Sequence, residues 1–378
     1  MPNYVNGMKS ISWITADYFL DVDLPVISLL KEDYRIYWQI VTGHASGPGQ
    51  EEYVRLLIPE PGDNLRIEFV HERYRRSDPR MFFSDLGTIR RAKSFRPDLY
   101  YISGFMYPWG LLLQKFLLPS ERVVMACHNV STPKGATRSW LARINIGFVL
   151  RNFRNIQVFS KSQRAVLESR YKDKNVLEAP LALKDYGHPS LPDTAQDKGF
   201  VRFLNFGIIR DYKRVDLLIE AGCLLYERGF RNYRILIAGS CPEWAERYAP
   251  LIKYPEVFEQ DIRRIPNEEV ANLFSVSDYF VMPYQDIAQS GAITVAFRYN
   301  VPVIVSDIPQ FREFVQDGKT GICFKSEDAV SLADTLQYAI EHHDAIHETL
   351  KLNQAAFVRD NFSLESIVTR YRSYLDRL

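Results

Sequence analysis

The chain has 378 residues, of which 46% are apolar and 25% charged, and its net charge at pH 7 is +1. This composition excludes an intrinsically disordered protein, and no apolar run approaches the 18 residues that a membrane-spanning helix needs. A chain of this length exceeds one ordinary hydrophobic core, so two domains are expected.

The N-terminal sequence, MPNYVNGMKSISWITADYF, lacks the basic start and the long apolar core of a secretory signal peptide. The four cysteines, at positions 127, 223, 241 and 323, are far apart and form no CxxC pair. Such cysteines are typical of buried thiols in a reducing compartment and do not indicate a zinc site. We therefore expect a cytoplasmic protein.

Short apolar runs alternate with helix-like segments in both halves of the chain. The predicted strands are 11–15, 99–103, 122–127, 155–159, 202–207, 233–239, 278–283 and 301–306. Nearly continuous apolar strands between helices indicate parallel sheets that are covered on both faces. The expected fold class is α/β, with two Rossmann-like, doubly wound domains facing a central cleft, where such sheets bind ligands.

A segment rich in Pro, Gly and polar residues, APLALKDYGHPSLPDTAQDKG, separates the two halves and is typical of a linker. The predicted boundaries are an N-terminal domain at 1–185, a linker at 186–199, a C-terminal domain at 200–360, and a last helix at 361–378. One arrangement open to this last helix is to cross back to the N-terminal domain.

Three polar residues precede helix-like segments in the second half of the chain. They are Asn267, Ser326 and Ser363. Side chains of this type accept hydrogen bonds from the free N–H groups of a first helical turn. Each is therefore predicted to cap the helix that follows it.

Charge is unevenly distributed along the chain. Within 115–174 there are twelve Lys and Arg against three Asp and Glu, which indicates an anionic partner, either phosphate or a lipid surface. The segment 137–155, TRSWLARINIGFVLRNFRN, is basic and amphipathic. A helix of this kind can lie on an anionic membrane at the inner face, and that interpretation stays open. A helix packed into the core of the N-terminal domain is the alternative.

The segment FGIIRDYKRVDLLIEA (206–221) carries the clearest chemistry. A predicted strand ends at Gly207, a loop with Arg210 and Lys213 follows, and a helix comes next. Two cations three residues apart at the carboxyl end of a strand can clamp a diphosphate. Solvated loop cations are the alternative on spacing alone.

A second anion site is predicted in QSGAITVAFRYNVPVIVSD. Gln289, Ser290 and Gly291 stand where a helix is expected to start. The free N–H groups and the dipole of a helix start favour an anion there.

These two segments, with PNEEVANLFSVSDYFVMPY between them, resemble the C-terminal half of nucleotide-sugar glycosyltransferases of the GT-B fold. The resemblance covers 200–345 and is greatest to the retaining glycosyltransferase family 4. PDLYYISG, ACHNVS and VFSKSQ match the first half of that family more loosely. The resemblance implies transfer from a UDP- or GDP-linked sugar to a hydroxyl of a glycan or lipid-linked glycan, as in polysaccharide biosynthesis.

The resemblance also assigns roles to single residues. Arg210 and Lys213 would bind the diphosphate and stabilise the leaving group, and His128 would face the transferred sugar, so these three form the implied catalytic set. The implied donor-binding residues are Gly207, Arg264, Ile265, Asp286, Gln289, Ser290 and Gly291. Arg264 and Ile265 match the place where the base is held, and Ser290 and Gly291 would offer backbone N–H groups.

No metal cofactor and no nucleic-acid partner are expected. Two cations neutralise the diphosphate without a metal. Asp21-Val-Asp23 has the spelling of a metal-binding DxD motif, which we attribute to chance. His343 and His347 are four residues apart, without an accompanying carboxylate motif, and we interpret them as part of a surface helix.

The sequence departs from the Glu-x7-Glu pattern that this family usually carries. Ile287 and Val295 occupy the two glutamate positions, although Asp286 is one residue from the first. Asn300 replaces the usual glycine at the end of the helix, and asparagine tolerates the left-handed conformation needed there. Two alternatives therefore stay open: a nucleotide-sugar epimerase of GT-B fold, and a non-catalytic GT-B binding subunit.

Overall fold

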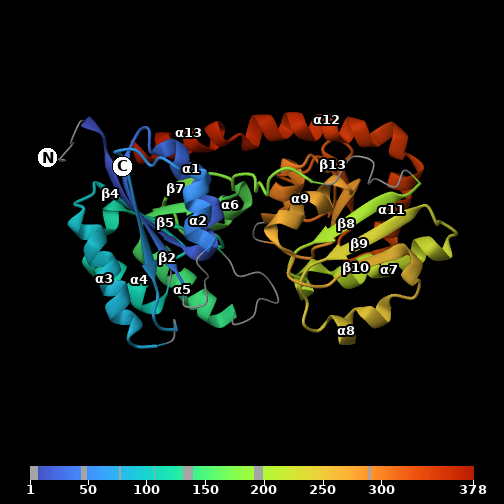
Figure 1. The fold of residues 1–378 in the computed structure, drawn as a ribbon, viewed down its shortest axis with the longest axis horizontal. Coiled ribbons are helices and arrows are strands. Elements are labelled where there is room, and N and C mark those ends of the chain that lie inside the picture. The colour runs from blue at the N-terminus through green and yellow to red at the C-terminus, as the bar shows by residue number, and fades with distance from the viewer. Residues whose placement is uncertain are drawn as a thin grey trace. The chain divides into compact units, whose positions relative to one another are not determined.

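The computed structural model describes residues 7–43, 49–75, 78–105, 107–130, 139–190, 199–287 and 291–378. The chain separates into two compact units (Figure 1). Unit 1 takes in the described residues up to Ala182 together with Ser363–Leu378, and unit 2 takes in those of Leu183–Phe362. No helix in the described part of the chain has the length and apolar character that crossing a membrane requires.

Unit 1 contains a seven-stranded parallel sheet in the order β3-β2-β1-β4-β5-β6-β7. Its strands are β1 (Ser10–Ala16), β2 (Arg35–Thr42), β3 (Leu65–His71), β4 (Leu99–Ser103), β5 (Val123–Ala126), β6 (Asn155–Val158) and β7 (Asn175–Glu178). The chain order reverses where β1 pairs with β4. This switch point is the mark of a doubly wound sheet.

Helices cover both faces of this sheet. They are η2 (Asp17–Phe19), α1 (Leu20–Leu30), α2 (Gly49–Leu57), α3 (Met81–Ser94), α4 (Pro108–Leu117), η3 (Ser120–Arg122), α5 (Ser139–Asn152), α6 (Lys161–Arg170) and α13 (Leu364–Leu375). Successive side chains of a strand point to opposite faces. In β1, Trp13 therefore joins the core cluster with α1 and α13, whereas Ile14 joins the cluster with α3, α4 and α5.

The last helix, α13, is part of unit 1. Ser363 caps it by accepting a hydrogen bond from the Ser366 N–H at 3.3 Å, which confirms the predicted cap. Tyr371 is fully buried and accepts a hydrogen bond from the side-chain amide of Gln157 at 2.5 Å. Tyr374 donates to the Asn175 carbonyl at 2.9 Å. The helix thus completes one covered face of the sheet.

Unit 2 contains a six-stranded parallel sheet in the order β10-β9-β8-β11-β12-β13. The strands are β8 (Val201–Phe206), β9 (Tyr233–Ala238), β10 (Phe258–Asp261), β11 (Tyr279–Met282), β12 (Val303–Ser306) and β13 (Gly321–Phe324). The helices are η5 (Asp211–Lys213), α7 (Val215–Glu227), α8 (Trp244–Arg247), η6 (Ala249–Leu251), η7 (Pro255–Val257), α9 (Asn267–Ser275), α10 (Gly291–Arg298), α11 (Ala329–Glu341) and α12 (His343–Phe362). Both sheets confirm the predicted fold class.

Two of the predicted helix caps in unit 2 are wrong. α9 begins at Asn267 itself, with Pro266 at the cap position and no side-chain cap bond. α11 is capped by Asp328, which accepts from the Ser331 N–H, rather than by Ser326. Asn300 does end α10 with a left-handed φ of 51°, as expected for a residue that replaces glycine.

Candidate active site

The carboxyl ends of β8 and β9 approach each other through two glycines. Gly207 follows β8 with a φ of +109°, and Gly239 follows β9 with a φ of +149°, both in the region that favours glycine. A Cβ added to Gly239 would lie 2.0 Å from the Gly207 carbonyl oxygen, and one added to Gly207 would lie 3.0 Å from Lys213 Nζ. A side chain at Gly239 would therefore displace the backbone of Gly207, and one at Gly207 would crowd the Lys213 ammonium.

Lys213 is a buried cation, with only 8% of its surface exposed. It ends η5, and its ammonium lies 5.4 Å from the centroid of the Tyr284 ring. Burial, and then the nearby Arg210 charge, lower the pKa of Lys213 to about 8. A buried ammonium without a paired carboxylate is costly. Among the described residues no carboxylate is paired with Lys213, so an anionic ligand at this point would supply a charge partner.

The structure brings Gly207, Arg210 and Lys213 together after β8. Arg210 is exposed, and its carbonyl accepts a hydrogen bond from the Lys213 N–H at 2.9 Å. The next cation, Arg214, adopts a left-handed φ of 49° and is paired with Asp216 at 2.9 Å. Arg214 therefore stabilises the start of α7 through its ion pair, whereas Arg210 and Lys213 lie in the segment that precedes this helix.

α10 begins at Gly291, at the predicted helix start. Gln289 and Ser290 lie outside the described residues. The φ of Gly291 is not in the left-handed region, and a Cβ there would lie 3.4 Å from Lys184 Cε. Thr294 closes the first turn by donating to the Gly291 carbonyl at 2.8 Å.

The two positions that replace the glutamate pair belong to the hydrophobic core. Ile287 and Val295 are both buried in the cluster that packs α10 against the sheet of unit 2. Asp286 is half-buried, and Gln310 donates a hydrogen bond to its carboxylate at 3.2 Å. Neither core position can present a polar group to a ligand without removing an apolar contact.

The two residues assigned to the base follow β10. Arg264 is exposed, and Ile265 is half-buried against the core. The neighbouring Arg263 is paired with Asp261 at 2.7 Å and with Glu269. That pairing fixes the loop before α9, in which both Arg263 and Arg264 are exposed.

His128 follows β5 in unit 1. Its ring lies edge-on to Phe19 at a centroid distance of 5.3 Å and tilted against Phe159 at 5.5 Å. Both phenylalanines are buried, and their contacts hold the half-buried imidazole ring of His128 in one orientation. The aromatic neighbours were not anticipated from the sequence, because Phe19 and Phe159 are far from His128 along the chain.

The DxD spelling in α1 has a structural explanation. Asp23 is buried and accepts hydrogen bonds from Trp13 Nε1 at 3.0 Å, Thr15 Oγ1 at 2.6 Å and Ser103 Oγ at 3.2 Å. Burial raises the pKa of Asp23 to about 7. The hydrogen bonds from these three buried side chains therefore engage its carboxyl group and make it unavailable to a metal ion.

The histidine pair in α12 is less exposed than a surface helix implies. His343 and His347 stack at a centroid distance of 4.6 Å beside Tyr279, and His347 Nε2 lies 3.1 Å from the Asp278 carbonyl. Burial lowers the pKa of His347. Among the described residues, no group of three His, Cys, Asp or Glu side chains is placed to hold a metal.

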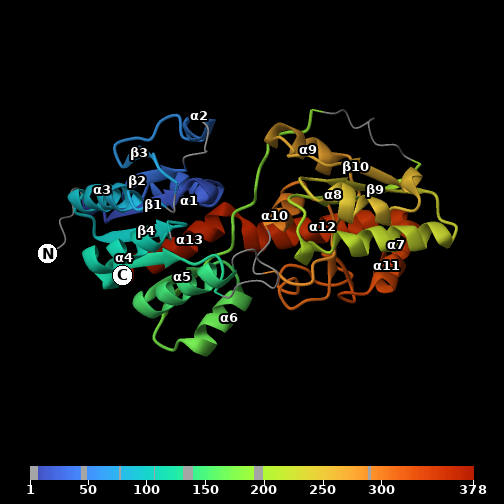
Figure 2. The ribbon, with the colours of Figure 1, turned by 90° about the horizontal axis from the view of Figure 1, so that it is seen from below.

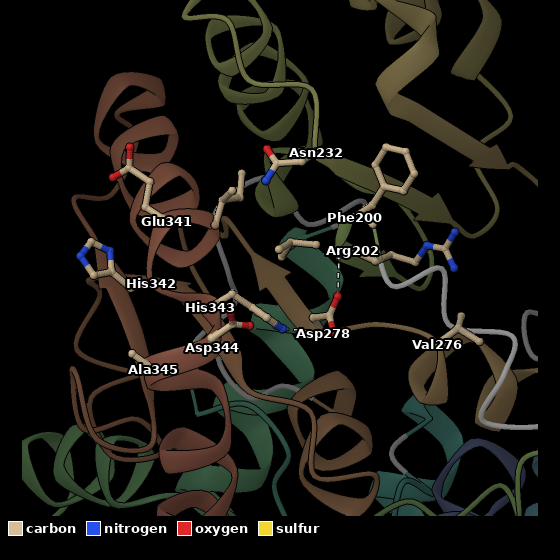
Figure 3. Close-up of a pocket in the computed structure, with 13 residues that line it drawn as sticks. Phe200, Arg202, Asn232, Val276, Asp278, Glu341, His342, His343, Asp344 and Ala345 are labelled. Carbon is tan, nitrogen blue, oxygen red and sulfur yellow. Dashed lines mark hydrogen bonds and ion pairs between the residues drawn. The ribbon is translucent and has the colours of Figure 1, made fainter.

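A cavity of about 490 Å³ lies in unit 2, at the amino ends of β8 and β11. Figure 3 shows Arg202, Asp278 and His343 on its wall, with Asp278 bonded to the start of β8. Gly207 and Lys213 stand at the opposite, carboxyl ends of these strands. The cavity is therefore separate from the predicted donor site.

The basic segment 137–155 divides between two environments. Residues 137 and 138 lie outside the described residues, and α5 covers Ser139–Asn152. Val149 is buried and Phe148 packs partly into the core of unit 1, whereas Trp140 and Ile144 are exposed. The helix therefore combines the core-packed alternative with an outward apolar surface.

Comparison with known proteins agrees with this geometry. Residues 201–342 match the family model described as "Glycosyl transferases group 1". A search of curated proteins by sequence returned no match.

Solved structures share the fold over almost the whole chain. A glycosyltransferase from Rickettsia africae is 14% identical, with a TM-score of 0.72 and 98% of each chain covered. Sucrose-phosphate synthase from Thermosynechococcus elongatus is 16% identical, with a TM-score of 0.73 and 98% of each chain covered. Anabaena Alr3699/HepE in complex with UDP is 14% identical, with a TM-score of 0.70, covering 98% of this chain and 100% of that one. Residues 201–342 of unit 2 thus match the group 1 glycosyl transferases, and the chain as a whole has the GT-B fold.

Proposed function

We propose that this glycosyltransferase moves a sugar from a nucleoside diphosphate sugar to a hydroxyl of a glycan or a lipid-linked glycan, with retention of configuration. The observation that carries the proposal is the buried Lys213 beside Arg210 and Gly207, at the carboxyl end of β8. Two cations at this point match the charge of a diphosphate. Unit 2 would accordingly bind the donor, and unit 1 the acceptor.

Electrostatic stabilisation of the leaving group would supply most of the catalysis. As the glycosidic bond breaks, negative charge develops on the departing diphosphate, and Arg210 and Lys213 are placed to balance it. Lys213 contributes more than a surface cation would, because a buried charge is screened less by water. The N–H groups at the start of α10 would hold the same phosphates, with Gly291 leaving the approach open.

The remaining residues would set the donor's position. Arg264 and Ile265 would hold the base, and Asp286 would meet a hydroxyl of the donor in place of the missing glutamates. His128 would face the transferred sugar from its aromatic support in unit 1. With two cations on the diphosphate, the proposed reaction proceeds without a metal.

The nucleotide and the place of action are also part of the proposal. The Anabaena neighbour was solved with UDP-glucose and a plant starch synthase neighbour with ADP, which favours a nucleoside diphosphate in this fold. We propose UDP or GDP as the carrier, and the cytoplasmic face of a membrane as the place where a lipid-linked acceptor is met. A thermal-shift screen with UDP, GDP and ADP identifies the base, because ligands that bind the folded state raise its stability.

Two substitutions test the catalytic assignment. We expect Arg210→Ala and Lys213→Ala each to lower kcat/KM about 100-fold or more, the scale of losing one donor that stabilises developing charge. Arg228→Ala, which removes an exposed arginine paired with Asp334, is the control and should leave kcat/KM unchanged. Transfer at the wild-type rate by both site variants would contradict the assignment.

Product analysis tests the reaction type. Nuclear magnetic resonance of the product should show the anomeric configuration of the donor. Incubation with donor alone separates transfer from epimerisation, since an epimerase releases a new sugar without any acceptor. Nucleotide binding without turnover on any acceptor would favour the binding-subunit alternative.

A further inference from the structure

Three helices of unit 1 carry a concentration of exposed apolar side chains. α3, α4 and α5 follow one another on one face of the seven-stranded sheet (Figure 2). The exposed apolar residues on them, which we call the apolar patch, are Phe83, Trp109, Leu112, Phe116, Trp140 and Ile144. Phe116 is 80% exposed, Phe83 72% and Trp140 59%. Large apolar side chains exposed on neighbouring helices of a folded protein indicate an interaction site.

α4 has apolar side chains on its outer side as well as on the side that packs into the core. Trp109, Leu112 and Phe116 recur at helical spacing on the outer side, whereas Leu111 and Leu113 on the inner side are buried. A helix that is apolar on both sides needs apolar contact on both. With ten residues, α4 is too short to cross a bilayer, so its outer side is suited to lie on one.

Charge on the same helices indicates what the partner is. Their basic residues are Arg90, Arg91, Lys93, Lys115, Arg143 and Arg151. Their one carboxylate, Asp85, is buried. Arg91 is paired with Glu68 of β3 at 2.8 Å. Lys115 is half-buried and donates to the Asn152 carbonyl at 3.4 Å, which leaves Arg90, Lys93, Arg143 and Arg151 exposed. The three helices thus expose apolar and basic side chains together, which is complementary to an anionic lipid headgroup layer.

We propose that the apolar patch docks unit 1 onto the surface of an anionic lipid bilayer. This proposal rests on the proposed function, because a lipid-linked acceptor would bring the protein to a membrane. It extends the membrane-binding surface from α5, which the sequence indicated, to α4 and α3. Two Trp side chains on the patch suit the boundary between headgroups and acyl chains. A second copy of the chain is a poorer occupant, because an isologous contact would bring two basic surfaces together.

Vesicle co-sedimentation of the full chain tests the proposal. We expect wild-type protein to pellet with phosphatidylcholine vesicles that contain phosphatidylglycerol, to stay in solution with phosphatidylcholine alone, and to dissociate as salt screens the charges. Phe116→Ser and the double variant Trp140→Ser/Ile144→Ser should each weaken partitioning about tenfold, since each removes large apolar surface. Leu352→Ser, which removes an exposed leucine from α12 in unit 2, is the matched control and should bind like wild type.

Tryptophan fluorescence gives a second readout. Brominated acyl chains should quench part of the wild-type emission, and Trp140→Phe should reduce the quenched part, because Trp13 and Trp38 are buried in unit 1 and out of reach. Circular dichroism of each variant checks that unit 1 still folds.

Three outcomes would overturn the proposal. One is wild-type protein that remains in the supernatant with anionic vesicles at low salt, and another is equal binding by the patch variants and Leu352→Ser. The third is a wild-type dimer that Phe116→Ser dissociates, without vesicle binding, since that result assigns the patch to a second copy. Thermal shifts caused by nucleotides, measured on the wild type and the same variants, report on unit 2. If no nucleotide stabilises any of these proteins, that result would count against the proposed function and not against the apolar patch.

Discussion

Lys213 combines the positive charge that the proposed donor site needs with a buried position. Its pKa of about 8 means that the free enzyme loses this charge as the pH rises through that value. We expect kcat/KM for the donor to fall on the alkaline side, because this ratio reports ionisation of the free enzyme. A bound diphosphate favours the charged lysine, so kcat should hold to higher pH. Both profiles, measured from neutral to alkaline pH, check this, and a flat kcat/KM would contradict it.

Asp23 makes the stability of unit 1 depend on pH. Burial raises its pKa from 3.8 to about 7, so between these values the folded state keeps a proton that the unfolded state loses. The contribution of this protonation to the free energy of unfolding is fully present below pH 3.8, and it is lost as the pH rises to about 7. In Asp23→Asn the difference in unfolding free energy between acid and neutral pH should therefore be smaller than in wild type. Denaturant unfolding of both proteins at several pH values measures this, and identical pH dependence would exclude Asp23 as its source.

One side of α10 packs into the core, and its N-terminus lies at the predicted phosphate site. Val295 is on the core side, so Val295→Glu buries a carboxylate rather than restoring a ribose contact. We expect it to destabilise unit 2 by about 3 kcal/mol or more, the range for an unpaired buried charge. Val330→Glu, at an exposed position in the first turn of α11, is the control and should be neutral. Denaturant unfolding compares the two, and a Val295→Glu protein of wild-type stability with tighter donor binding would refute this view.

The start of α10 is expected to respond to side-chain shape. Among the described residues, the three atoms nearest to a Cβ at Gly291 belong to the flexible Lys184 side chain, the first at 3.4 Å, so Gly291→Ala should fold and bind nucleotide nearly as well as wild type. The branched side chain of Gly291→Val would crowd the N–H groups and weaken nucleoside diphosphate binding about tenfold. Calorimetric titration with UDP or GDP measures the difference. Equal affinity in both variants would remove this helix start from the donor site.

The chain as a whole depends on its last helix. α13 buries Ile367, Val368, Tyr371, Tyr374 and Leu375 in unit 1, far in sequence from the rest of that unit. At about 1.5–3 kcal/mol for each buried side chain, this contact is comparable with the net stability of a domain. Deleting 363–378 should therefore leave unit 1 unfolded or aggregated while unit 2 still binds nucleotide. The single change Tyr371→Phe removes the hydroxyl that bonds to Gln157 and Tyr101 but keeps the buried ring, so this variant should fold. Limited proteolysis of both proteins distinguishes them, and a protease-resistant unit 1 in the truncated chain would contradict the prediction.

The sequence by itself determined the α/β class and most of the sheet interiors. All eight predicted strands are present, because a strand buried on both faces must be almost continuously apolar. The strands that it did not reveal are β2 and the four at the sheet edges, β3, β7, β10 and β13. The edge strands β3, β7 and β10 are partly exposed and carry polar residues, as FEQD in β10 shows, so their apolar signal is weak. The edge strand β13, GICF, is mostly buried, but it is only four residues long.

For the site, the sequence determined which residues follow β8, since a strand, a glycine and two cations are local features. Only the tertiary structure decided that Lys213 is buried, that Ile287 and Val295 face the core, and that Asp328 rather than Ser326 caps α11. Each of these depends on which neighbours the fold brings from distant parts of the chain. The apolar patch has the same origin: Phe83, Phe116 and Trp140 are unremarkable one by one, and only the packing of three helices on one sheet brings them to a common surface.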